Sequence, residues 1–231
     1  MLNQMSVQKY KAVRFPILYI AALVTITMGF LYGYLKLPPT FDTNAVFSDT
    51  VCDTSGFFIF ALVAAWFAGN DFLTRTIHNE IKAGYRRFSL ILTRTVTTTT
   101  MVILLHLGYI LSTVIGFSVK NGFDTSLFTV VNLFWLLTVL IQVCADICIV
   151  MFIVFSLKKA TSAIAVAVVF AFIAFNVLRN FISESVFRLT PFSLAQTSDA
   201  GTLALSAVIA AAVIAWTLTA THFVFRKAEI K

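Results

Sequence analysis

The sequence predicts an all-α integral membrane protein with six transmembrane helices and both termini in the cytoplasm. Its 231 residues are 59% hydrophobic and only 12% charged, whereas soluble domains carry roughly twice that share of charged residues. Long apolar runs recur along the chain, without the alternation of apolar and polar residues that is typical of a membrane β-barrel. Backbone polar groups inside a bilayer must then be satisfied within helices.

Six apolar segments have lengths suited to crossing a bilayer, which takes about 20 helical residues. They cover residues 15–35, 54–68, 88–117, 126–157, 161–178 and 202–225. We expect a single transmembrane domain over 1–231, with an interfacial N-terminal segment at 1–14 and an outer-leaflet helical element at 179–199. Residues 36–53, between the first two spans, are expected to form a loop.

The predicted orientation follows from the basic residues, because these collect in cytoplasmic loops. One side of the predicted bundle carries thirteen of the seventeen lysines and arginines, and the other side carries four. The larger set comprises Lys9, Lys11, Arg14, Arg75, Lys82, Arg86, Arg87, Arg94, Lys158, Lys159, Arg226, Lys227 and Lys231. This asymmetry places both termini and the segment 69–94 in the cytoplasm.

The segment 69–94 is the longest polar interruption in the sequence, and it lies between the second and third predicted spans. Read as a helix, it places Leu73, Ile77 and Ile81 on one apolar stripe, because they recur at every fourth position. Its polar residues lie largely on the other faces. Such a helix can lie in the headgroup layer or dock onto a soluble partner, and we favour docking.

Motifs for catalysis and for direct nucleotide binding are absent from the sequence. No glycine is followed by lysine, so the phosphate loop is missing, and H-E-x-x-H, C-x-x-C and G-x-S-x-G do not occur. We therefore expect a chain without enzymatic activity, metal or cofactor. The net charge of +7 follows from the cytoplasmic basic residues, and we expect no binding to nucleic acid.

Polar residues at membrane depth are costly and are therefore candidates for function. His106 lies near the middle of the third span, and Asp146 lies inside the fourth span with Gln142 one turn before it. One interpretation is a proton site on a transport path, with His106 and Asp146 paired across adjacent helices. The other, which we favour, is buried hydrogen bonding that fixes helix packing. Gly29 and Gly33 have the spacing of a close helix–helix contact.

The polar segment carries the runs GNDF at 69–72, TRTI at 74–77 and GYRR at 84–87. Together with six spans, this pattern resembles the permease subunits of type-2 ABC exporters. In that family the loop between spans two and three holds a coupling helix that docks on the ATPase subunit. The resemblance implies a coupling helix and turn at 69–87. The implied ATPase interface comprises Asp71, Leu73, Arg75, Ile77, His78, Asn79, Ile81, Lys82, Arg86 and Arg87.

The resemblance further implies the transmembrane subunit of an ATP-driven exporter in a plasma membrane, most often bacterial in this family. A second copy or a paralogue would complete the permease, and separate ATPase subunits would bind ATP and magnesium. Short bacterial members often export amphipathic peptides, such as bacteriocins and toxins, or give immunity to them, so an amphipathic or hydrophobic cargo is expected. The alternative is a self-contained secondary transporter or channel that uses Asp146 and His106 for proton coupling. A third option is a non-transporting membrane anchor.

Overall fold

The chain folds into a bundle of helices. The computed structural model describes residues 2–37, 43–53, 56–122, 130–194 and 200–226, and these residues form helices but no strand. The expected start of the fourth span at 126–129 and the end of the 179–199 element lie outside the described residues, as do Lys227 and Lys231. The all-helical class predicted from the sequence is confirmed for the part of the chain that the structure describes.

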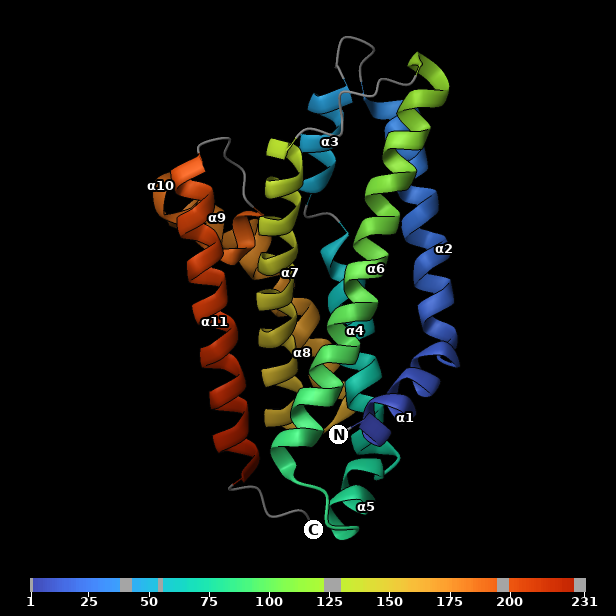
Figure 1. The fold of residues 1–231 in the computed structure, drawn as a ribbon, viewed down its shortest axis with the longest axis vertical. Helices are drawn as coiled ribbons and strands as arrows, with labels where there is room; N and C mark the ends of the chain where they lie inside the picture. Colours follow the sequence, from blue (N-terminus) through green and yellow to red (C-terminus); the bar gives the residue numbers. More distant parts are fainter. Residues whose placement is uncertain (1, 38–42, 54–55, 123–129, 195–199, 227–231) are drawn as a thin grey trace.

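The described residues of the first half of the chain form six α-helices and a short π-helix (Figure 1). These are α1 (Leu2–Val13), α2 (Pro16–Leu31), the π-helix η1 (Tyr32–Lys36), α3 (Thr43–Val51), α4 (Phe57–Leu73), α5 (Thr76–Lys82) and α6 (Arg87–Asn121). The second half comprises α7 (Val130–Leu157), α8 (Ala160–Phe172), the π-helix η3 (Ile173–Val177), α9 (Leu178–Phe181), α10 (Glu184–Phe187), the 3₁₀-helix η4 (Pro191–Ser193) and α11 (Ala200–Arg226). Pro16 begins α2, where its missing N–H costs no hydrogen bond.

Four helices in the described residues are long and apolar enough to cross a membrane, namely Pro16–Lys36, Arg87–Asn121, Asn132–Leu157 and Ala200–Arg226. The bent pair formed by α4 and α5 makes a fifth if it counts as one span. Side chains on the outside agree with a lipid environment, since Leu23, Val208 and Trp216 are 69%, 65% and 74% exposed. These helices indicate a membrane-embedded protein. The sixth span and the orientation of the termini stay predictions.

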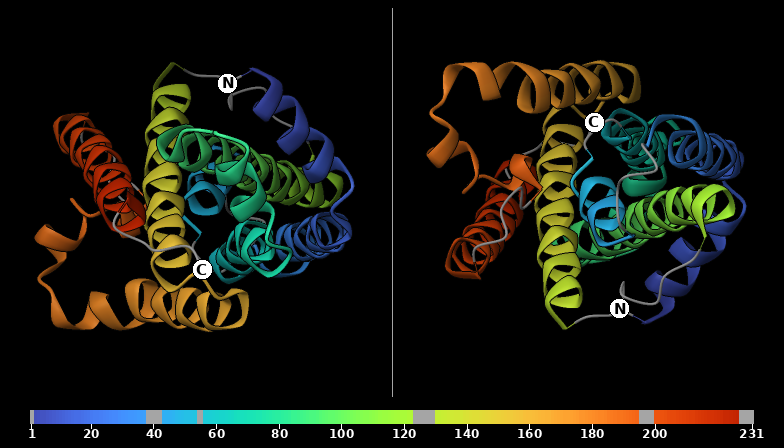
Figure 2. Two further views of the ribbon diagram at one scale, coloured as in Figure 1. Left: turned by 90° about the horizontal axis from the view of Figure 1, so that it is seen from below. Right: turned by 90° about the horizontal axis from the view of Figure 1, so that it is seen from above.

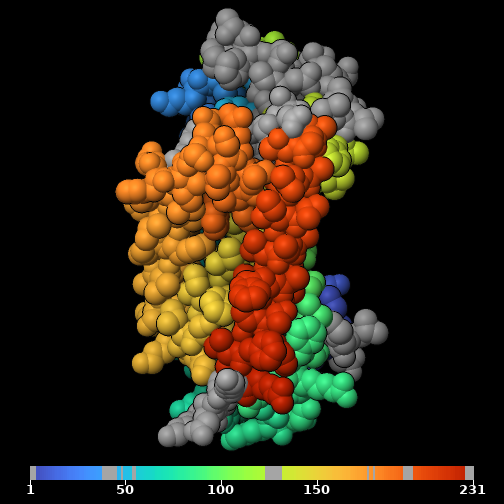
Figure 3. Space-filling view, turned by 90° about the vertical axis from the view of Figure 1, so that its left-hand side faces the viewer, coloured from blue at the N-terminus to red at the C-terminus, as the bar shows by residue number. Residues whose placement is uncertain are grey.

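The centre of the bundle is formed by α4, α6 and α7, which pack against one another. Each carries one outer neighbour, because α2 packs on α6, α8 packs on α4 and α11 packs on α7. In the most apolar stretches of α2 and α11, 22% of the residues are buried, compared with 56% in α6 and 61% in α7. The helices α2 and α11 therefore lie on the outside. Figure 2 shows α2 and α11 on opposite sides of the centre, and Figure 3 shows α11 along the outer surface.

The loop expected at 36–53 is wrong over half of its length, because α3 forms at Thr43–Val51. Val46, Thr50 and Val51 are fully buried, and α3 packs against α6 and α7. The Thr50 hydroxyl donates to the carbonyl of Val46 at 2.7 Å. The proline pair and the three aspartates of this segment suggested a loop, whereas its apolar residues recur at helical spacing and cover the core. In Figure 1 α3 lies at the end of the bundle opposite α5.

The second predicted span, 54–68, ends too early, because α4 continues to Leu73. A side chain at Gly69 would place its Cβ 3.1 Å from the Cα of Ala160, so α4 and the start of α8 approach closely there. Phe72 packs against α7, with its ring centroid 5.5 Å from that of Phe155. The first residues of the polar segment are therefore part of the bundle wall.

Candidate functional site

A sharp bend separates α4 from α5 at one end of the bundle. The two helices meet at 56°, and Arg75 between them has a left-handed backbone, with φ of 54°. Thr74 stabilises the end of α4, because its hydroxyl donates to the carbonyl of Asn70 at 2.9 Å. Gly84, with φ of 87°, makes the return turn into α6, a conformation that favours glycine. The predicted coupling helix therefore begins at Thr76 and not at Asp71.

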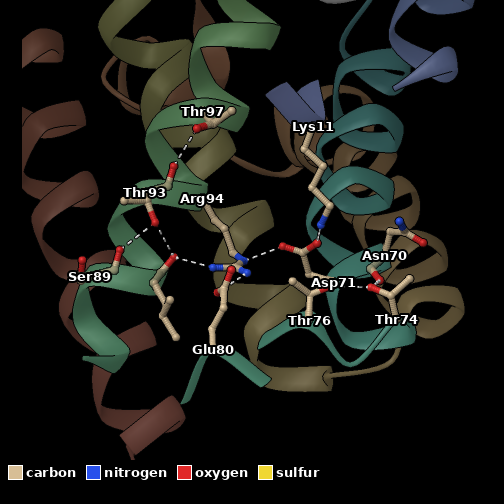
Figure 4. Close-up of polar contacts among 11 residues, drawn as sticks. Lys11, Asn70, Asp71, Thr74, Thr76, Glu80, Ser89, Thr93, Arg94 and Thr97 are labelled. Carbon is tan, nitrogen blue, oxygen red and sulfur yellow. Dashed lines mark hydrogen bonds and ion pairs between the residues drawn. The ribbon is translucent and has the colours of Figure 1, made fainter. Parts of the chain in front are cut away.

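Four charged side chains join this bend to the bundle, and we call them the ion-pair cluster: Lys11, Asp71, Glu80 and Arg94. The Nε of Arg94 on α6 donates to Oδ2 of Asp71 on α4 at 2.6 Å. Its Nη2 donates to Oε2 of Glu80 on α5 at 2.8 Å. Lys11 on α1 pairs with the other oxygen of Asp71. Figure 4 shows the four side chains converging from four helices.

The ion-pair cluster is largely withdrawn from solvent. The side chains of Asp71 and Arg94 are each 1% exposed, and that of Glu80 is 18% exposed. Burial, followed by the charge of Arg94, lowers the pKa of Lys11 to about 8, against the opposing effect of Glu80. Lys11 therefore still carries its charge at neutral pH, and the two basic groups balance the two acids. Removing one member would leave an uncompensated buried charge.

The N-terminal helix α1 is tied to α6 by a second contact. The hydroxyl of Ser89 donates to Oε1 of Gln4 at 2.6 Å, and Gln8 and Ala12 are also buried. Together with Lys11, these residues fasten α1 across the start of α6. The interfacial segment predicted at 1–14 is therefore a helix that takes part in the site.

Arg87 closes the site on the side of α11. Its Nη1 donates to the carbonyls of Phe225 at 2.7 Å and Arg226 at 2.9 Å. These carbonyls lie at the end of α11, where they lack partners within the helix. Arg87 thus caps α11 from the first residue of α6, and its positive charge opposes the negative end of the helix dipole.

We expect Arg87→Ala to fray the last turn of α11. The loss of a charged group at a helix C-terminus costs typically about 0.3–1 kcal/mol, so hydrogen exchange in the last turn of α11 should accelerate while the rest of the bundle is unchanged. The matched control is Arg86→Ala, which removes the exposed neighbouring arginine. Equal exchange rates in the two variants would contradict the capping role.

The structure divides the predicted ATPase interface between an inward and an outward set. Asp71 belongs to the ion-pair cluster, and Ile77 is 2% exposed and packs into the bundle core with Ile81. Leu73, by contrast, is 71% exposed. The apolar stripe expected from Leu73, Ile77 and Ile81 is therefore broken, because the bend at Arg75 turns α5 relative to α4.

The outward set forms one exposed face of the bend, which we call the docking face. It contains five of the predicted residues and one additional aromatic residue, Tyr85, which is 45% exposed. His78 and Arg87 are partly buried beside it. The docking face comprises Leu73, Arg75, Asn79, Lys82, Tyr85 and Arg86.

Sequence reasoning missed the structural role of three members of the ion-pair cluster, Lys11, Glu80 and Arg94. Each was noticed only as one charge among many in segments predicted to be cytoplasmic. One signal was present: Arg94 lies inside the third predicted span, where an ionisable residue is costly and needs a partner. Its partner Asp71 is 23 residues away on a helix whose end was placed too early.

The candidate polar residues inside the membrane are all buried, and they separate into two groups. His106 is 1% exposed and lies edge-on to Phe60 of α4, with 5.7 Å between ring centroids. Gln142 and Asp146 on α7 have no exposed surface. Within the described residues no hydrogen bond or ion pair joins His106 to Asp146. The pairing considered from the sequence is therefore not formed here.

The glycine pair of the first span lies against α6. A Cβ on Gly29 would lie 2.7 Å from the carbonyl oxygen of Tyr109, and one on Gly33 would overlap the carbonyl of Thr113. Gly116 of α6 makes a matching close contact with α2, since a Cβ there would overlap the carbonyl of Phe30. This glycine motif therefore serves a contact within the chain.

Comparison of the chain with family models, with curated proteins and with solved structures finds no match. The function must accordingly be argued from the geometry of the site.

Proposed function

We propose that this chain is the transmembrane permease subunit of an ABC-type exporter and that α5 with the docking face receives the ATPase subunit. One observation carries the proposal: Glu80 of α5 pairs with the buried Arg94 of α6, and Arg94 also pairs with Asp71 of α4, which in turn pairs with Lys11 of α1. A short helix that is joined to this network and packed into the core through Ile77 moves with the bundle as one body. A force applied to α5 by a partner is then transmitted to the membrane helices.

The chemistry of the docking face supports a protein partner. It combines three basic residues, Arg75, Lys82 and Arg86, with two large side chains, Leu73 and Tyr85, that are exposed beside them. Arginine and tyrosine are enriched in binding hot spots, and the basic residues would steer a partner with an acidic rim. The chain itself has no phosphate loop, so the proposed partner supplies ATP hydrolysis.

Six spans with cytoplasmic termini are part of the proposal. In addition to the four long helices, α4 would form one crossing. The remaining crossing would run through α8, η3 and α9, consecutive helical segments of 13, 5 and 4 residues. At 1.5 Å per residue these span about 33 Å, close to the thickness of a hydrocarbon core. The docking face then lies on the cytoplasmic side by the positive-inside rule.

An amphipathic or hydrophobic cargo completes the proposal. An apolar hollow of about 440 Å³ lies where α7, α11 and the segment with α10 and η4 meet. Its walls are formed by Ile149, Val186, Leu189, Thr190, Pro191, Phe192, Ile209 and Val213. Such a wall suits the apolar side chains of a peptide better than a charged solute.

We expect the triple variant Arg75→Glu, Lys82→Glu and Arg86→Glu to lose its ATPase partner while it folds normally. The three side chains are exposed, so their reversal should leave the free energy of unfolding within about 0.5 kcal/mol and repel an acidic partner rim. The measurement is purification of the tagged full chain from its native membrane, followed by assay of ATP hydrolysis and identification of the co-purified subunits. A subunit with a phosphate-loop motif should co-purify with the wild-type chain.

The matched control is Lys36→Glu, which reverses an exposed lysine at the end of η1. It should retain both the partner and the ATPase activity. Proton-driven transport by the chain reconstituted alone, with no ATPase present, would contradict the proposed function and favour the secondary transporter. Retention of the ATPase by the triple variant would move the interface away from α5.

A further inference from the structure

A second polar site lies on α6 and α7 in the centre of the bundle, and on α6 it begins at the residue after Arg94 of the ion-pair cluster. Thr95 and Thr98 on α6 and Gln142 and Asp146 on α7 are 4%, 0%, 0% and 0% exposed. Their hydroxyl, amide and carboxyl groups have no hydrogen-bond partner among the described residues. We call these four residues the α6–α7 polar site. Buried polar groups in folded proteins are almost always paired, so four unpaired groups on two packed helices call for an explanation.

The two threonines differ from the others along α6. The hydroxyls of Thr93, Thr97, Thr100 and Thr113 each donate to the carbonyl four residues earlier. This bond satisfies a threonine within a helix. The hydroxyls of Thr95 and Thr98 are buried without it. They therefore remain free to bind another group inside the bundle.

Thr98 and Asp146 lie at a similar depth in the bundle. α6 and α7 pack against each other and run in opposite directions (Figure 1). Thr98 is eleven residues from the start of α6, and Asp146 is eleven residues from the end of α7. At 1.5 Å per residue both are about 16 Å from the same end of the bundle. This depth is near the middle of a hydrocarbon core about 30 Å thick.

No charged group compensates Asp146. It forms no ion pair within the described residues. The nearest titratable groups on its own helix are the thiols of Cys144 and Cys148. Those on the helices packed against α7 lie beside other groups. Asp71 and Arg94 pair with each other, Asp49 and Asp53 accept from Tyr32 and Tyr109, Arg226 ends α11 beside Arg87, and His106 and His222 lie against Phe60 and Phe88.

We propose that the α6–α7 polar site binds an exchangeable proton, with Asp146 as the acceptor. An isolated carboxylate in an apolar core is too costly to remain ionised, and it neutralises by taking up a proton. One carboxylate oxygen gains one proton from water, and the same proton returns to water on release. Gln142, Thr95 and Thr98 hold the water through which the proton moves, because their polar groups are otherwise unused.

A proton fits this site better than a metal ion. The described residues contain no group of three or more histidine, cysteine or acidic side chains able to hold one. The site offers a single carboxylate together with neutral amide and hydroxyl groups, so one proton balances its charge. The proposal stands independently of the docking face, because it requires no ATPase and no contact at α5.

The test is infrared spectroscopy of the purified full chain in lipid, combined with labelling by dicyclohexylcarbodiimide, which reacts with protonated carboxyl groups in apolar surroundings. Wild-type chain should show the C=O stretch of a protonated carboxyl, and this band should titrate with external pH. Labelling at Asp146 should fall about tenfold for each pH unit above the midpoint. Asp146→Asn should remove both signals, and Asp146→Glu should restore labelling.

The variants Thr98→Val and Gln142→Leu distinguish an Asp146 carboxyl group that exchanges its proton with water from one that is only buried. Both retain Asp146, and both should slow the exchange of its proton with D₂O at least several-fold. A carboxyl band that does not respond to external pH would overturn the proposal, because the acid would then be a sealed structural group. Labelling that is independent of pH but blocked by sodium ions would also overturn it, in favour of a cation site. If Asp146→Asn fails to fold, the titration of wild type alone still decides between these outcomes.

Discussion

Replacing Arg94 with methionine should destabilise the folded chain by about 3–5 kcal/mol, the usual cost of removing one partner of a buried ion pair. Arg94 is fully buried and is the member of the ion-pair cluster that contacts both acids. Without it, Asp71 retains only Lys11, and Glu80 loses its partner on α6. The attachment of α5 to the bundle should fail first, because Glu80 is the only member that α5 contributes.

The measurement is unfolding of the purified full chain in lipid bicelles, together with hydrogen exchange across α5. A double-mutant cycle with Asp71→Leu tests the coupling. The single changes should each be severe, whereas Asp71→Leu with Arg94→Met should recover part of the loss, since two apolar residues can replace a buried pair. Additive losses in the double variant would show that Asp71 and Arg94 act independently, contrary to this prediction.

The control is the exposed pair Glu184 and Arg188, whose side chains are 69% and 44% exposed. Glu184→Gln breaks an ion pair of the same type on the surface and should cost about 0–1 kcal/mol. A comparable loss at Glu184 and at Arg94 would mean that burial does not set the importance of the cluster.

The sequence located the site but not its internal geometry. Polarity alone marked 69–94 as exceptional in an apolar chain, and its helical stripe suggested a short helix. The same polarity made Asp71 look solvent-exposed, although it is buried in the last turns of α4. Whether a charge in a membrane protein faces water or a partner depends on contacts between distant segments, here α1, α4, α5 and α6. A single sequence carries no direct signal of those contacts.

The α6–α7 polar site could also be predicted only in part from the sequence. Asp146 and Gln142 stood out because a polar residue in an apolar run is conspicuous. Thr95 and Thr98 did not, since threonine is common in membrane helices and usually bonds to its own backbone. Only the positions of their hydroxyls distinguish them from Thr93 and Thr97. Likewise, the sequence left open a pairing of His106 with Asp146 as the less favoured interpretation, whereas in the structure His106 lies against Phe60.

Close packing of α2 and the following η1 on α6 leads to the second large expected effect, which concerns Gly33 of η1. Gly33→Ala adds a single methyl group that would overlap the carbonyl of Thr113, and the next contact is the backbone nitrogen of Phe117 at 3.0 Å. Backbone atoms cannot rotate away as a side chain can, so the two helices must separate. Overpacking typically costs about 1–3 kcal/mol, and the preference of helices for alanine, about 1 kcal/mol, offsets only part of it.

Gly108→Ala provides a control on the same pair of helices. A Cβ at Gly108 would lie 3.8 Å from Cγ1 of Ile26, which is an ordinary contact, so this variant should be as stable as wild type or slightly more stable. Crosslinking of cysteines placed on facing turns of α2 and α6 measures the separation directly and should weaken in Gly33→Ala alone. Because the contact lies within one chain, the loss of stability in Gly33→Ala should be the same at any protein concentration. A loss of stability that becomes smaller as the protein concentration rises would instead place Gly33 at an interface between two copies.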